Sequence, residues 1–201
     1  MKPFGPKSLY ANRRLRRCHY GAGHGVHSTF AFRLIREVMA SPYPYYADRS
    51  MQARYSALSP EKREEALDLE VGRLWFRLIA RMAPSVVYYS LTKALSDAQY
   101  YGQTADSRIE HRISGRDLHL EDTHRPMLIC DQVDEALIFV EHCPPENEAV
   151  VLILGIRQGK ASYTAWRSFV STAKRGIILD AYDCGIFINR NKHLSFYRAG
   201  Y

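Results

Sequence analysis

The sequence has no acidic residue in its first 36 positions, no C-x-x-C pair, and no long apolar run. Its cysteines are widely spaced, which argues against a zinc ribbon or a disulfide framework; they are Cys18, Cys130, Cys143 and Cys184. Because no stretch approaches about 18 apolar residues, we expect no transmembrane helix. The basic N-terminus is not followed by an apolar segment, so we expect no secretory signal. These absences favour a reducing, cytoplasmic location.

The excess positive charge lies at the N-terminus. Eight Lys and Arg residues precede the first acid, Glu37, while the rest of the chain carries 20 basic and 21 acidic residues. We interpret residues 1–27 as a basic arm of loop structure. Such an arm suits nucleic acid, an acidic membrane surface or an acidic protein. A nucleic-acid-associated protein is the weakest of our function hypotheses, because the arm has only eight cations and no interleaved aromatic residues beyond Tyr10 and Tyr20. A solvated terminus is the alternative that we favour.

Residues 28–82 are predicted to form an N-terminal helical segment. Ser28 precedes a run of apolar residues at helical spacing and suits an N-cap. Ser59-Pro60 marks a further helix start, because proline is favoured in the first turn. We expect that second stretch to continue to residue 82, with a break near Gly72.

Residues 83–201 alternate short apolar runs with helical stretches, which predicts βαβ units. With 201 residues, 46% of them apolar, the chain is long enough for one structural domain. We therefore predict an α/β, Rossmann-like, doubly wound and mostly parallel sheet, with an antiparallel C-terminal strand pair at its edge. The predicted strands are 86–89, 109–113, 127–130, 149–154, 177–180, 185–188 and 195–197, and the predicted helices are 91–101, 133–142 and 161–172.

Four stretches, in order along the chain, carry a family resemblance. Residues 24–30 (HGVHSTF) are similar to "HGVHSPF", and residues 44–46 (PYY) follow as a Tyr-rich break. Residues 72–79 (GRLWFRLI) are similar to "GKLLFRLV", and residues 178–186 (ILDAYDCGI) to the hairpin "IDLFDLGIVFFR". The chain thus resembles a divergent member of a bacterial family of class I S-adenosylmethionine-dependent methyltransferases. The resemblance implies the class I methyltransferase fold, in which S-adenosylmethionine lies at the carboxyl ends of the parallel strands.

The sequence departs from this family where the cofactor is normally held. The family's first core strand ends in an acid and a Gly-rich turn, "LELGTSLG", where this chain has VYYSLTKA. Tyr88 holds the acid position, and Ser90 and Ala94 hold glycine positions. A Cβ there crowds the ligand and disfavours positive φ, and Tyr88 and Tyr89 can fill the cleft themselves. We therefore expect S-adenosylmethionine to bind weakly or not at all.

The other acids of the family pattern are also missing. Glu110 lies inside its predicted strand, so it is a poor match for the acid that holds the ribose. The acid pair at the end of the fourth strand is replaced by Leu154-Gly155. An oxygen-ligated metal needs such carboxylates, so no metal site is expected. Asp131 alone keeps an acid at a strand end, and we prefer to interpret it as the N-cap of the next helix.

A basic turn follows the fourth predicted strand. It contains Gly155, Arg157, Gly159 and Lys160, and backbone N–H groups at such a turn can bind an anion or an anionic substrate. An ordinary turn is the alternative. No catalytic residue can be identified from spacing.

Two function hypotheses follow. The first is a methyltransferase-fold protein with weak or lost cofactor binding, acting as a binding or interaction module for a small molecule or protein. The second is an active S-adenosylmethionine-dependent methyltransferase with a rebuilt, metal-independent site. Ser90, Thr92, Asp131 and the basic turn at 155–160 would then line the site.

Overall fold

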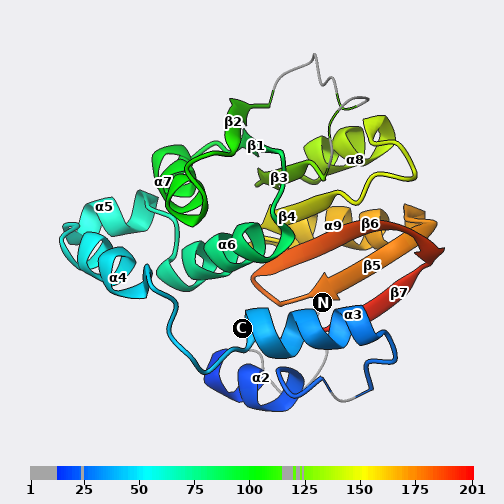
Figure 1. Cartoon of the computed structure of the whole chain (residues 1–201), viewed down its shortest axis with the longest axis horizontal. Coiled ribbons are helices and arrows are strands. Elements are labelled where there is room, and N and C mark those ends of the chain that lie inside the picture. The colour runs from blue at the N-terminus through cyan, green and yellow to red at the C-terminus, as the bar shows by residue number, and fades with distance from the viewer. Residues whose placement is uncertain (1–12, 24, 115–119, 121–122, 124) are drawn as a thin grey trace.

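The computed structural model describes residues 13–23, 25–114, 120, 123 and 125–201 (Figure 1). Residues 1–12 of the predicted arm, and His24 of the first family-like stretch, lie outside this range. The described chain forms a Rossmann-like α/β fold with helices on both faces of one seven-stranded sheet. None of the helices in these ranges combines the length and the apolar character needed to cross a membrane.

The sheet has the strand order β2-β1-β3-β4-β6-β5-β7. Its four innermost parallel strands carry Val, Ile, Leu, Tyr and Met on both faces, because helices cover the sheet on each side. Every predicted strand is confirmed. The bounds are β1 Val86–Ser90, β2 Glu110–Ile113, β3 Met127–Cys130, β4 Val150–Leu154, β5 Arg175–Asp180, β6 Cys184–His193 and β7 Ser195–Arg198.

The C-terminal strand pair is antiparallel as predicted, but its position at the edge is wrong. Strand β6 runs antiparallel between β4 and β5. Strand β7 then pairs in parallel with β5, with Ile178 opposite Phe196, and becomes the edge. The hairpin is thus an internal part of the sheet, which explains why β5 and the first half of β6 are buried.

The helices form two layers (Figure 1). One layer packs α3, the π-helical segment η1, α6 and α7 against one face, and the other packs α8 and α9 against the opposite face. The bounds are α2 Arg13–Tyr20, α3 Thr29–Arg33, η1 Leu34–Met39, α4 Asp48–Ser56, α5 Pro60–Glu65, α6 Leu69–Met82, α7 Leu95–Ala105, α8 Val133–His142 and α9 Lys160–Thr172.

The predicted helix starts at Ser28 and Ser59 are confirmed, since each hydroxyl accepts a backbone hydrogen bond from the first turn. The predicted break at Gly72 is wrong. The chain turns instead between α5 and α6, where Asp68 caps α6 by accepting from the N–H groups of Glu70 and Val71. Gly72 is helical, and it is small because the Tyr101 ring of α7 packs directly on it.

The N-terminal arm is not all loop, so that expectation is wrong for residues 13–20, which form α2. The C-terminal end of α2 contacts the segment that follows η1. Arg17 donates hydrogen bonds to the carbonyls of Ala40 and Ser41, and a Cβ on the buried Gly21 would lie 2.7 Å from the Cβ of Ala40. The C-terminal part of the arm is therefore attached to the helical layer.

Candidate functional site

A cavity of about 570 Å³ lies at the carboxyl edge of the sheet. Strands β1 and β3 are neighbours in the sheet, but the chain runs from β1 to β2 on one side and from β3 to β4 on the other, so the connections after β1 and β3 diverge. In open α/β sheets such a switch point is where ligands bind. Loops after β1, β3 and β4, the β5–β6 turn and the segment between α5 and α6 form its walls. We call it the switch-point cavity.

Thr92 and Asp131 join the first two of these loops. The carboxylate oxygen Oδ2 of Asp131 accepts from the backbone N–H of Thr92 at 2.8 Å and from its hydroxyl at 2.5 Å. The other oxygen, Oδ1, is buried and has no hydrogen-bond partner among the described residues. The N-cap interpretation of Asp131 is wrong, because Gln132 occupies that position and α8 has no side-chain cap. The carboxylate instead bridges to the loop after β1.

Arg157, in the turn after β4, is held in place by a partly buried ion pair. Its two terminal nitrogens lie 2.8 and 2.6 Å from the two carboxylate oxygens of Asp180, and it also donates to the carbonyl of Tyr182 at 2.9 Å. The rings of Tyr163 and Tyr182 lie 5.0 and 4.9 Å from its guanidinium carbon. Burial alone would lower the pKa of Arg157, but the hydrogen bonds and charge of Asp180 raise it above its usual value.

The structure brings only some of the predicted site residues together. Thr92, Asp131, Gly155 and Arg157 are all in the wall of the switch-point cavity. Gly155 has a φ of +65°, and a Cβ there would meet the side chain of Gln158. Ser90, Gly159 and Lys160 lie outside that wall, and Gly159 and Lys160 begin α9. Because Asp180 already binds Arg157, the turn offers an anion less charge than its sequence suggests.

Most of the acidic residues in the cavity wall were missed by the sequence reasoning. They are Glu64, Glu65, Asp68 and Asp183, which join Asp131. The cations in the wall are Lys93 and Arg157, so the wall has a formal charge of −3. The mixed charged run at 61–65 (EKREE) is visible in the sequence, but no pattern indicates that it folds back to the carboxyl edge of the sheet. The electrostatics of the cavity favour a cationic ligand.

The two tyrosines of β1 do not fill this cavity, so that expectation is wrong. Tyr88 packs on Phe139 beneath α8, with ring centroids 5.8 Å apart. Tyr89 points to the opposite face, where its hydroxyl lies 2.7 Å from Nδ1 of His111, and burial raises the pKa of Tyr89 far above its usual value. Both rings belong to the core, because successive side chains of a strand point to opposite faces.

Ala94, at one of the family's glycine positions, has the left-handed backbone predicted for it, with a φ of 58°. We expect Ala94→Gly to raise the free energy of unfolding by about 0.5 kcal/mol, because relief of roughly 1–2 kcal/mol of left-handed strain exceeds the added entropy of glycine. Urea denaturation measures this. Ala80→Gly, at an exposed helical position of α6, is the matched control and should cost about 1 kcal/mol. Destabilisation by both variants would contradict the strain at Ala94.

The remaining positions where the family carries acids offer the cavity no carboxylate. Glu110 begins β2 and pairs with Arg112 at the surface, away from the cavity. Within the described ranges, no three His, Cys, Asp or Glu side chains come close enough to hold a metal ion. Leu154 and Gly155 line the cavity where the family's acid pair is expected.

No protein-family model matches this chain, and no curated protein is significantly similar to it.

Proposed function

We propose that this protein is a methyltransferase-fold binding module whose switch-point cavity takes a cationic group, and that it binds S-adenosylmethionine weakly or not at all. The observation that carries the proposal is the loop after β1. Tyr88 belongs to the core where the family places an acid, and Ala94 brings a Cβ where the family has glycine. The backbone N–H and the hydroxyl of Thr92 both donate hydrogen bonds to Asp131, so this loop has fewer donors available to hold a cofactor.

The charge of the cavity supports a cationic ligand. Five carboxylate side chains face two cations there, and one of those cations, Arg157, is paired with Asp180 outside the wall. A small molecule with an amino group, or a Lys or Arg side chain of a protein, carries the complementary charge.

One observation favours the second function, an active methyltransferase with a rebuilt, metal-independent site. S-adenosylmethionine carries a sulfonium and an ammonium group, and Asp131 has a buried oxygen without a hydrogen-bond partner in the described part of the chain. The rebuilt site would use Thr92 and Asp131 from the loops of β1 and β3, and the acids of the segment between α5 and α6.

A thermal-shift titration separates the two functions. At 1 mM cofactor, a dissociation constant near 1 mM stabilises the protein by about 0.4 kcal/mol, whereas one near 5 μM stabilises it by about 3 kcal/mol. For a chain of this size these correspond to shifts of about 1 °C and about 6–12 °C. We expect the small shift with both S-adenosylmethionine and S-adenosylhomocysteine. The large shift would favour the rebuilt enzyme.

A further inference from the structure

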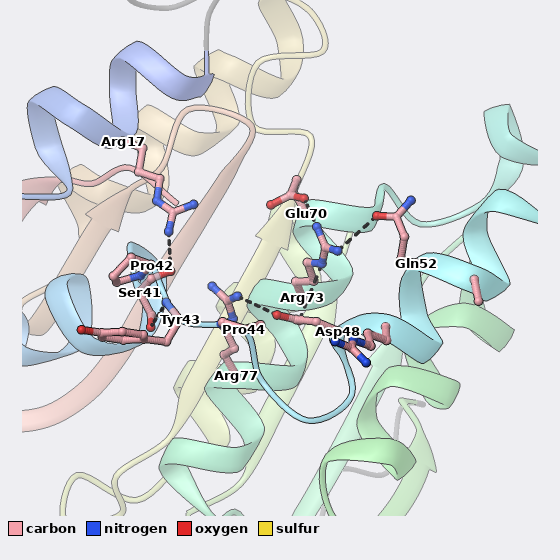
Figure 2. Close-up of a pocket in the computed structure, with 12 residues that line it drawn as sticks. Arg17, Ser41, Pro42, Tyr43, Pro44, Asp48, Gln52, Glu70, Arg73 and Arg77 are labelled. Carbon is pink, nitrogen blue, oxygen red and sulfur yellow. Dashed lines mark hydrogen bonds and ion pairs between the residues drawn. The ribbon is translucent and has the colours of Figure 1, made fainter.

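A second cavity, of about 590 Å³, lies on the side of the helical layer that carries α2. Figure 2 shows it between Arg17 of α2, the loop at 41–44, the start of α4 and one side of α6. No residue of its wall belongs to the switch-point cavity. It is therefore a separate feature, which we call the arginine cavity.

The arginine cavity carries an excess of positive charge. Its wall contains four arginines, Arg17, Arg49, Arg73 and Arg77, but only two carboxylates, Asp48 and Glu70. The formal charge of the wall is therefore +2, opposite in sign to that of the switch-point cavity. Four guanidinium groups from three different helices come together here.

Arg77 lies at the centre of this group and is only 9% exposed. A terminal nitrogen of Arg77 donates to Oδ2 of Asp48 at 3.4 Å, but that oxygen also accepts from the backbone N–H of Tyr45 at 2.9 Å. The Tyr45 ring lies 4.9 Å from the guanidinium carbon. Nε of Arg77 is buried and has no hydrogen-bond partner among the described residues. This nitrogen is out of reach of a ligand, so binding in the cavity would use the terminal nitrogens of Arg77, one of which makes only a long hydrogen bond to an oxygen that Tyr45 also uses.

The remaining charges do not neutralise the cavity. The terminal nitrogens of Arg73 donate to a carboxylate oxygen of Glu70 at 2.5 Å and to the side-chain oxygen of Gln52 at 3.1 Å. The charge of Glu70 is therefore paired with Arg73. Asp48 lies 3.6 Å from Nε of Arg73 as well as beside Arg77, so it is shared between them. Arg17 donates to main-chain carbonyls, which accept hydrogen bonds without neutralising its charge.

We propose that the arginine cavity is a binding site for the phosphate group of a small phosphomonoester. A guanidinium presents a planar fork of N–H donors that matches a phosphate, and arginine is the preferred residue for such recognition. A phosphomonoester carries a charge of about −1.5 to −2 at neutral pH, which matches the +2 of the wall, whereas a carboxylate neutralises only half of it. Tyr43, 75% exposed at the rim, offers a ring surface to the organic part of the ligand.

Calorimetric titration of the full chain tests this at constant ionic strength, with phenyl phosphate, inorganic phosphate, benzoate and phenol as probes. We expect phenyl phosphate to bind with a dissociation constant below about 1 mM, at least about tenfold tighter than benzoate. Phenol should not bind measurably. Inorganic phosphate separates recognition of the anion from contact with the ring, and it should bind more weakly than phenyl phosphate.

Four variants locate the site. Arg77→Lys keeps the charge but loses the fork, and should weaken phenyl phosphate binding at least about tenfold. Arg49→Gln removes an exposed charge at the rim and should weaken phenyl phosphate binding severalfold without affecting folding. Arg73→Gln should also weaken binding severalfold, but with some loss of stability, because Arg73 is partly buried and pairs with Glu70 and Asp48. Arg33→Gln removes an exposed charge from α3, outside the cavity, and should leave binding unchanged.

Three results would overturn the proposal. These are no saturable binding of phenyl phosphate, equal loss of binding in the Arg33 variant, or unchanged affinity in the variants at 49 and 77. Circular dichroism checks that each variant is folded. If Arg77→Lys does not fold, Arg49→Gln and Arg73→Gln decide the outcome.

Discussion

Replacing Arg157 with alanine is expected to destabilise the protein by about 3–5 kcal/mol, because it leaves a buried carboxylate without its counter-ion. Asp180 is 9% exposed. Its remaining hydrogen bonds would come from Tyr182 N at 3.0 Å and Trp166 Nε1 at 3.4 Å. Two neutral donors do not replace a bidentate guanidinium. Guanidinium chloride denaturation should show the loss, and thermal unfolding should show a decrease of about 6–20 °C.

Two controls show whether the effect belongs to the ion pair. Lys160→Ala removes an exposed cation three residues away and should change the free energy of unfolding by less than about 0.5 kcal/mol. The double variant Arg157→Ala/Asp180→Asn should recover part of the stability, because the uncompensated charge is then gone. A loss below about 1 kcal/mol in Arg157→Ala would contradict a buried pair, since exposed pairs contribute that little.

Gly72→Ala is the second substitution for which we expect a large effect. It should destabilise the protein, although helix propensity alone would favour alanine. Alanine in place of a helical glycine normally stabilises by about 1 kcal/mol. Here the new Cβ would lie 2.3 Å from Cε2 and 2.7 Å from Cδ2 of Tyr101, whose ring is buried. Overpacking of this kind costs about 1–3 kcal/mol or more. With the gain in helix propensity subtracted, we expect a net loss of about 1–2 kcal/mol, measured by urea denaturation.

The matched glycine control is Gly159, where a Cβ would meet nothing within 4 Å. Gly159 is the N-cap of α9, where alanine is less favoured than glycine, so Gly159→Ala should cost some stability but less than about 1 kcal/mol. Gly72→Ala combined with Tyr101→Leu should recover stability relative to Gly72→Ala alone, because a smaller side chain makes room for the Cβ. Stabilisation by Gly72→Ala on its own would show that α6 and α7 are not in close contact.

Local patterns predicted the elements well because their causes are local. The apolar run at 150–154 became a buried strand because five consecutive apolar residues suit a sheet covered on both faces. Ser28 and Ser59 marked helix starts through a hydroxyl and a backbone N–H three residues away. Gly72 misled the prediction, because a glycine in a helix indicates either a break or a close neighbour, and only the fold shows Tyr101 there.

The site was predicted only in part because it depends on contacts between distant segments. Asp131 looked like a helix cap, since its contact with Thr92 spans 39 residues and leaves no local signal. The acids at 64–68 reach the cavity through the turn between α5 and α6. Arg157 was predicted to serve an anion, but Asp180, 23 residues later, already pairs with it.

We propose that the switch-point cavity lacks the groups with which the methyltransferase family that the sequence resembles holds S-adenosylmethionine. The missing partners of the ribose and ammonium groups cost roughly 1–3 kcal/mol each. Each ~1.4 kcal/mol is tenfold in affinity, so a micromolar dissociation constant should move toward millimolar.

Isothermal titration calorimetry of the purified chain with S-adenosylmethionine and S-adenosylhomocysteine tests this most directly, with Asp131→Asn as a matched variant. We predict dissociation constants near 1 mM or no measurable heat, and little change in the variant. A dissociation constant of a few micromolar that is lost in Asp131→Asn, or cofactor that remains bound through purification, would contradict the claim and favour the rebuilt site.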